Sequence, residues 1–264
     1  MEAATTMEMA LNEAARTRGA AASARAMLRD VKIAFGGQTV LDGVTFDLRP
    51  GELALLGGEN GSGKTVLLNV LSGHLAPDRG SVELQFGERR VDAVRSSPER
   101  LARLGLGRLW QDIRLFPSMT VLDNVLAGTA GMLGQNPILA VLALPAVLRQ
   151  ERMARKRAHQ NLATVGMADR AQSSCDMLSV GQMKRVAVAR LLQMEASLLL
   201  LDEPLAGLDA DAAEAFSHDL GRLCSKHGKT ILVVEHRHDA ISRFADRVWK
   251  LNHGRLEEIE RSHV

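Results

Sequence analysis

The stretch Gly58-Glu59-Asn60-Gly61-Ser62-Gly63-Lys64-Thr65 decides how the rest of the chain is interpreted. It fits the pattern G-x-x-x-x-G-K-[ST], in which glycines allow successive backbone N–H groups to surround phosphate oxygens. The apolar run 53–57 before it is typical of a buried strand, and the helical stretch 66–72 after it directs a helix N-terminus at the phosphates. Lys64 is then expected to reach the β- and γ-phosphates, and the Thr65 hydroxyl to bind Mg²⁺. A glycine-rich turn that binds nothing is the alternative, and both flanks argue against it.

Composition is that of an ordinary globular protein. A chain of 264 residues suits one large domain or a core with a subdomain. Lys and Arg number 33 against 31 Asp and Glu, so a net charge of +2 gives no argument for a nucleic-acid or anionic membrane partner. Cys175 and Cys224 match no metal-ligand spacing, and we expect two free thiols in a reducing compartment.

No stretch of the sequence approaches the roughly 18–20 apolar residues that a membrane span requires. The nearest is 137–148, which is shorter and contains Pro145. The N-terminus has no compact apolar core and carries Glu2, Glu8 and Glu13, so it resembles neither a signal nor a transit peptide. The expectation is a soluble, cytoplasmic chain.

The first part of the chain is expected to be a tail followed by strands. The tail covers residues 1–24, and hydrophobic alternation and turn residues then mark the elements. These are strands at 27–33 and 44–48 separated by turns at Gly36-Gly37 and Asp42-Gly43, a hairpin of 81–86 and 89–91, a helix that starts at Ser97-Pro98, and a strand at 107–110.

The pattern turns helical from about 112 to 176 and then alternates between strand and helix. Thr120 is a candidate N-cap for 121–127, and the basic run 149–157 begins a helix with a solvated face. The apolar segment 137–148 is either buried in this helical region or exposed as a partner surface. Helices at 179–193 and 210–226 follow, with strands at 198–201, 230–234 and 248–251. This alternation predicts a parallel sheet covered on both faces.

Two carboxylates follow the buried strand 198–201. Asp202 at the carboxyl end of that strand is where a phosphate-bound Mg²⁺ needs a partner. Glu203 is suited to orient or deprotonate an attacking water. Ordinary polar residues at a strand end are the alternative, which the phosphate loop disfavours.

Leu178-Ser179-Val180-Gly181-Gln182 opens the helix at 179–193. This L-S-x-G-Q sequence, between the phosphate loop and Asp202, resembles the signature of ATP-binding cassette (ABC) proteins. The resemblance implies that Ser179, Gly181 and Gln182 cap the γ-phosphate of ATP bound by an opposite subunit. A hydroxyl and a backbone N–H at a helix N-terminus are suitable donors.

The resemblance also implies a fold. It is a P-loop NTPase (RecA-like) α/β core with a parallel sheet, an N-terminal antiparallel β subdomain and a helical subdomain inserted at about 112–176. The ATPase domain would span residues 25–264.

Other cassette motifs follow in order. Gln111 is similar to the Q-loop glutamine that touches Mg²⁺, and the segment 206–209, which ends at Asp209, resembles the D-loop that communicates across the dimer. His236 corresponds to the switch histidine at the γ-phosphate, with His238 as a rival. Phe35 stands where the family has an aromatic residue on adenine, although a core phenylalanine is the alternative.

The segments 108–117 and 119–125 resemble the ATP-binding subunits of branched-chain amino acid importers. That resemblance implies an ATPase paired with a second cassette, as a homodimer or heterodimer, on the cytoplasmic face of membrane permease subunits. A solute-binding protein would deliver the solute, and no nucleic acid is expected. Urea, amide or lipid transporters, a soluble ABC protein and a cassette that binds ATP without hydrolysing it are alternatives.

Two residues of the phosphate loop depart from that family pattern. Glu59 stands where the importers often have Pro, and Val66 where they have Thr or Ser. Val66 lacks a hydroxyl for the α-phosphate, and a hydrogen bond to a charged group contributes about 1.5–3 kcal/mol. Its backbone N–H remains available.

Overall fold

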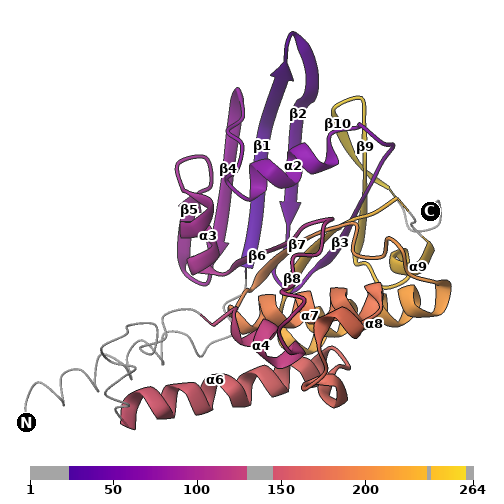
Figure 1. The fold of residues 1–264 in the computed structure, drawn as a ribbon. Helices are drawn as coiled ribbons and strands as arrows, with labels where there is room; N and C mark the ends of the chain where they lie inside the picture. The colour runs from indigo at the N-terminus through magenta and orange to yellow at the C-terminus, as the bar shows by residue number, and fades with distance from the viewer. Residues whose placement is uncertain (1–23, 130–144, 237–238, 260–264) are drawn as a thin grey trace, which may run out of the picture.

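The computed structural model describes residues 24–129, 145–236 and 239–259. Two sheets form its framework (Figure 1). The smaller is an antiparallel sheet with the order β2-β1-β4-β5. Its strands are β1 (Ala24–Phe35), β2 (Gln38–Leu48), β4 (Arg79–Phe86) and β5 (Arg89–Asp92). The N-terminal antiparallel subdomain is therefore confirmed.

The larger sheet has the order β10-β9-β3-β8-β7-β6. All neighbouring pairs in it are parallel except β10 with β9. Its strands are β3 (Leu53–Gly57), β6 (Leu106–Leu109), β7 (Leu198–Asp202), β8 (Thr230–Val234), β9 (Arg247–Asn252) and β10 (Arg255–Ile259).

The central strands are buried on both faces, as their uninterrupted apolar sequence predicts. In β3, Leu53 and Leu55 join one hydrophobic cluster while Ala54 and Leu56 join another. The first cluster includes residues of the helices α4 (Val121–Leu126), α6 (Pro145–Thr164), α7 (Val180–Gln193) and α8 (Ala210–His227), and the second unites α2 (Lys64–Leu71) with both sheets. The predicted covering of both faces is confirmed, with the antiparallel sheet and α2 on one of them.

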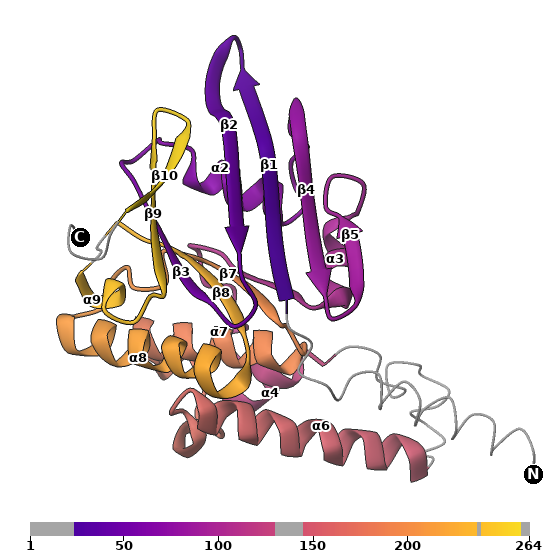
Figure 2. The same ribbon diagram turned by 180° about the vertical axis from the view of Figure 1, so that it is seen from behind.

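The helices lie mainly on the face away from the antiparallel sheet, as Figure 2 also shows from behind. Their bounds are α2 (Lys64–Leu71), α3 (Pro98–Leu104), α4 (Val121–Leu126), α6 (Pro145–Thr164), α7 (Val180–Gln193), α8 (Ala210–His227) and α9 (Asp239–Ser242). Short 3₁₀ turns, Ala168–Arg170 and Cys175–Met177, connect α6 to α7.

Several expected boundaries differ from the structure. Strand β1 begins at Ala24, and β2 runs through Asp42-Gly43, where a turn was expected, because 38–41 already pair with the end of β1. Residues 112–120, where the helical pattern was expected to begin, contain no helix. Helix α6 begins at Pro145, before the basic run 149–157 where it was expected to start, because proline is tolerated in the first helical turn. Strand β10 was not predicted, because its sequence is mostly charged and only its pairing with β9 defines it.

Expected helix starts are confirmed at their caps. The hydroxyls of Ser97, Thr120 and Ser179 accept hydrogen bonds from the backbone N–H groups three residues on. Both cysteines are free and buried. Within the described ranges, no helix is long and apolar enough to cross a membrane. Of the apolar segment 137–148, the part up to 144 lies outside the described residues.

Candidate nucleotide site

The loop between β3 and α2 approaches other backbone segments so closely that side chains are excluded at two positions. Gly58 has φ +139°, and a Cβ there would lie 2.4 Å from the carbonyl oxygen of Leu251. Gly63 has φ +103°, and its Cβ would lie 3.0 Å from Val40 Cγ1. The loop is therefore fixed against β2 and β9 by glycines that no other residue can replace without displacement.

Lys64 closes this loop from inside. Its Nζ donates to the carbonyl oxygens of Gly58 and Glu59, at 2.7 Å each. Burial lowers the pKa of Lys64, while the charges of Glu203 and Asp202 oppose this effect. The ammonium group therefore lies within electrostatic range of both predicted carboxylates.

The loop also has unused polar groups that suit phosphate oxygens. Ser62 Oγ is buried without a hydrogen-bond partner. Helix α2 has no side-chain cap at Gly63 and no acidic residue in its first turn, so its first N–H groups and its dipole favour an anion. Thr65 is exposed at this helix start. These features fit the triphosphate of a nucleotide.

The neighbouring strand ends bring three predicted residues together. Strands β6, β7 and β8 are adjacent and parallel, and Gln111, Glu203 and His236 follow their carboxyl ends. Gln111 Nε2 donates to Glu203 Oε2 at 2.9 Å, and His236 Nε2 lies 3.0 Å from Glu203 Oε1. The carboxylate of Glu203 is therefore oriented from both sides.

Asp202 lies one residue earlier, at the buried end of β7. Burial raises the pKa of its carboxyl group, and the charges of Arg108 and Lys64 oppose that rise. Within the described part of the chain, no cluster of three or more His, Cys, Asp or Glu side chains could hold a metal alone. Mg²⁺ at nucleotides uses one or two carboxylates together with phosphates. The hard oxygens of Asp202 and Thr65 therefore fit Mg²⁺.

The signature and D-loop residues form a second group. Ser179 caps α7 by accepting from Gln182 N at 3.3 Å, and Gln182 Oε1 accepts from Ser179 N at 3.0 Å. A Cβ on Gly181 would lie 2.9 Å from Leu208 Cδ2, so the D-loop packs on the start of α7. Asp209 caps α8. None of these contacts reaches Lys64.

Phe35 is at the end of β1, and half of its surface is exposed (50%). Its strand partner across the turn is Gln38. Phe35 is therefore not a core residue. Val40, in the same hairpin, lies against Gly63 of the phosphate loop. Val66 in α2 is half-buried. Stacking of Phe35 on adenine stays a prediction.

Arg108 is a residue of this region that the sequence patterns did not single out, and its side chain is almost fully buried. Its Nη1 donates to Ser72 Oγ at 2.7 Å, and its guanidinium lies 3.6 Å from the Trp110 ring centroid. Its Nη2 is 3.9 Å from Asp202 Oδ2. Burial lowers the pKa of Arg108 to about 10. An arginine within a four-residue buried strand was the available signal.

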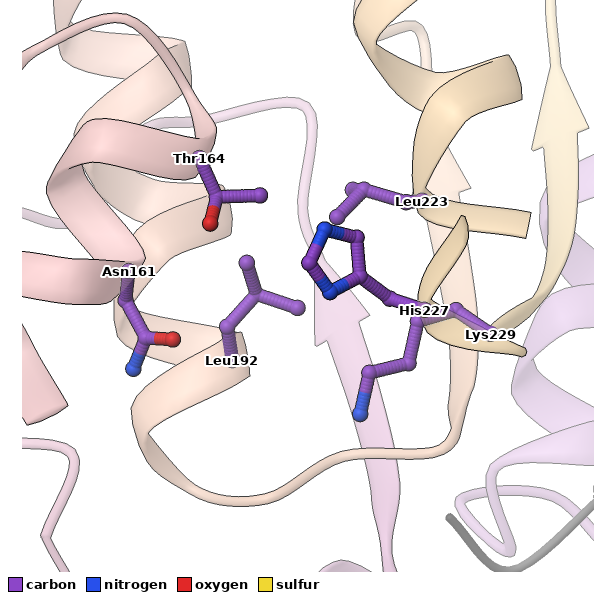
Figure 3. A pocket seen from close by; sticks show the side chains of 6 residues that line it. All are labelled: Asn161, Thr164, Leu192, Leu223, His227 and Lys229. Carbon is purple, nitrogen blue, oxygen red and sulfur yellow. The ribbon is translucent and has the colours of Figure 1, made fainter. Parts of the chain in front are cut away.

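A small pocket lies elsewhere, where α6, α7 and the end of α8 meet (Figure 3). Its lining residues are Asn161, Thr164, Leu192, Leu223, His227 and Lys229. Lys229 Nζ donates to the Ala196 carbonyl at 2.7 Å, while burial and the nearby positive charges lower the pKa of His227 in the last turn of α8. Lys229 therefore has a structural role.

Comparison with known proteins decides the family. A family model described as "ABC transporter" matches residues 41–206. The chain belongs to the ABC transporter family. It is an ATP-binding cassette, of the class of ATPases that couple ATP hydrolysis to transport.

Two relatives and two solved cassettes illustrate the similarity. The high-affinity branched-chain amino acid transport ATP-binding protein LivG of Salmonella typhimurium is 32% identical, over 83% of this chain and 85% of LivG. The phosphate-import ATP-binding protein PhnC of Mycolicibacterium smegmatis is 37% identical, over 86% and 83%. The ADP conformation of one ABC transporter cassette matches with a TM-score of 0.73, 28% identity and 89% of each chain. A dimeric bacterial cassette matches with a TM-score of 0.68 and 27% identity, over 89% of this chain and 99% of the other.

Proposed function

We propose that this cassette is the ATP-hydrolysing subunit of an importer for branched-chain amino acids or related small polar solutes. The observation that carries the ATPase chemistry is the carboxylate of Glu203, held between Gln111 and His236 beside the phosphate loop. Similarity to LivG supports the solute class. Similarity to PhnC keeps other imported solutes as the alternative.

ATP binding is assigned to the loop from Gly58 to Val66 and to Phe35. The α2 N-terminus and Lys64 attract the phosphates, and Ser62 Oγ supplies a donor that is otherwise unused. Thr65, Gln111 and Asp202 would hold Mg²⁺, whose charge offsets the negative charge on the phosphate oxygens. Gln111 would then bind Mg²⁺ through its side-chain oxygen, because its Nε2 donates a hydrogen bond to Glu203.

Hydrolysis requires a water aligned with the γ-phosphate. Glu203 accepts a hydrogen bond from that water, since each carboxylate oxygen has acceptor capacity beyond its bond to Gln111 or His236. As the water oxygen attacks phosphorus, its proton moves toward Glu203 and the bond to the ADP oxygen breaks. His236 orients the carboxylate through Nε2, and its ring would contact the γ-phosphate.

Three further partners complete the proposal. Ser179, Gly181 and Gln182 would contact ATP bound by a second cassette, with Asp209 at the dimer contact, and the dimeric neighbour supports this arrangement. The pair would attach to the cytoplasmic face of permease subunits, with a solute-binding protein on the other side.

Glu203→Gln tests the catalytic assignment. The amide keeps the shape of the side chain but cannot accept a proton, so turnover is expected to fall by about 10²–10⁴-fold while ATP binding persists. Steady-state hydrolysis and calorimetric ATP binding measure the two effects. Glu88→Gln, an exposed glutamate in the β4–β5 turn, is the matched control. Near-normal hydrolysis by the Glu203 variant would remove this residue from the mechanism.

Solute uptake tests the transport assignment. Cells that carry either the unaltered chain or the Glu203→Gln variant are supplied with labelled leucine, urea or phosphate. Selective loss of leucine uptake in the variant is the expected result. Selective loss of urea or phosphate uptake would assign the alternative importer class.

A further inference from the structure

Lys184 is a buried lysine that none of the nucleotide contacts above explains. It lies in the first half of α7, shortly after the signature residues, and is 4% exposed. Its Nζ donates to the backbone carbonyls of Glu203 at 2.9 Å and Ala206 at 2.6 Å. An ammonium group is buried at a high cost unless it is hydrogen-bonded and paired, so these two bonds define where this side chain must stay.

The first of those carbonyls belongs to an unusual backbone position. Glu203 has φ +47°, in the left-handed region that non-glycine residues rarely adopt and that costs about 1–3 kcal/mol. Its N–H donates to the Val234 carbonyl at 2.9 Å, while its carbonyl accepts from Lys184. The peptide groups on both sides of this carboxylate-bearing residue are therefore fixed from other elements.

The second carbonyl belongs to the start of the D-loop. There the Leu205 N–H donates to Glu235 Oε1 at 2.5 Å, and Glu235 is 3% exposed. Glu235 directly precedes His236, and its charge faces Lys184. Lys184 in the signature helix and Glu235 at the end of β8 therefore both form hydrogen bonds with the backbone of the same turn, 203–206.

We propose that Lys184 is a positioning residue for hydrolysis, which joins the signature helix to the backbone of Glu203 and to the D-loop. A displacement of α7 then displaces the turn that bears the Glu203 carboxylate, because Lys184 is hydrogen-bonded to the backbone carbonyls at both ends of that turn, Glu203 and Ala206. Lys184 acts through Glu203 and touches no nucleotide. The inference rests on the proposed role of Glu203.

Lys184→Met tests this role, because methionine retains most of the stem and removes the two donors. The expected result is a fall in kcat of about 10²-fold from misplacement of Glu203, with the Kd for ATP unchanged. Faster amide hydrogen exchange is expected in peptides that cover 203–206 and not in those that cover β3.

Lys229→Met is the matched control. Lys229 is half-buried and donates to a single carbonyl, that of Ala196, outside the site. The Lys229→Met variant is expected to be less stable and to have an unchanged kcat. Equal loss of kcat in both variants would reduce Lys184 to a packing residue. Lys184→Arg, which retains donors, is expected to recover turnover and protection of 203–206.

A double-mutant cycle with Glu203→Gln separates the inference from the proposed function. If Lys184 acts through Glu203, adding Lys184→Met to Glu203→Gln lowers the residual turnover less than it lowers that of the unaltered chain. Additive losses would overturn the inference. Unimpaired turnover of Glu203→Gln would overturn the proposed catalytic role instead, and faster exchange at 203–206 in Lys184→Met would still be expected.

Discussion

Glu235 shows how one buried carboxyl group connects the site to folding. Burial raises its pKa from an ordinary 4.5 to about 7, although the Leu205 N–H, Lys184 and the His236 backbone favour the charged form and Glu203 opposes it. Between these two values the folded chain binds more protons than the unfolded chain. Stability is therefore expected to fall as pH rises through this window.

Glu235→Gln should remove that dependence. The amide oxygen can still accept from Leu205, but it has no charge to bury. From about pH 5 to about pH 8, the free energy of unfolding should shift in favour of the variant by about 2–3 kcal/mol. Urea denaturation at both pH values measures it, with Glu88→Gln as the exposed control. Parallel pH profiles for the variant and the unaltered chain would contradict the assignment.

At the scale of elements, α7 combines a structural and a recognition role at its first residue. The Ser179 hydroxyl accepts the capping bond from Gln182, which leaves its proton free to be donated. Two substitutions separate the roles. Ser179→Ala should cost about 1 kcal/mol of stability through the lost cap.

Ser179→Asp should preserve stability, because aspartate is an equally good cap. Its negative charge would nevertheless repel the phosphates that the signature is proposed to meet. ATP-driven association, measured by light scattering in a Glu203→Gln background, should therefore be lost. Intact association of the aspartate variant would leave Ser179 with its capping role alone.

The sequence predicted elements and residues well where one short pattern contains the information. Lys64, Glu203 and His236 follow strands whose apolar runs are unambiguous, and the structure brings the last two together. Lys184 and Glu235 were missed, because their partners lie on segments distant in the sequence. The Asp42-Gly43 turn was wrongly expected, because pairing with β1 overrides local turn preference.

On the scale of the whole molecule, the cassette is expected to associate when it binds ATP. The phosphate loop and the signature group do not contact each other through any of the interactions described above, and the proposal is that each chain supplies halves of two different sites. ATP should drive Glu203→Gln into a dimer, either with itself or with a related cassette. Light scattering measures this, and a Lys64→Ala, Glu203→Gln double variant should stay monomeric. Monomers with every candidate cassette would contradict the proposal.

The contact of Gly58 with the Leu251 carbonyl bears on how this protein is made. The Asp42 N–H likewise donates to the Gly254 carbonyl at 2.8 Å. The ribosome translates the phosphate loop long before it translates β9 and the turn after it. A nascent chain with Gly58 already outside the exit tunnel therefore lacks the surface against which the loop closes. Competence for ATP is therefore expected to arise only after nearly all of the described chain has been synthesised, and products truncated before β9 are expected to bind no ATP.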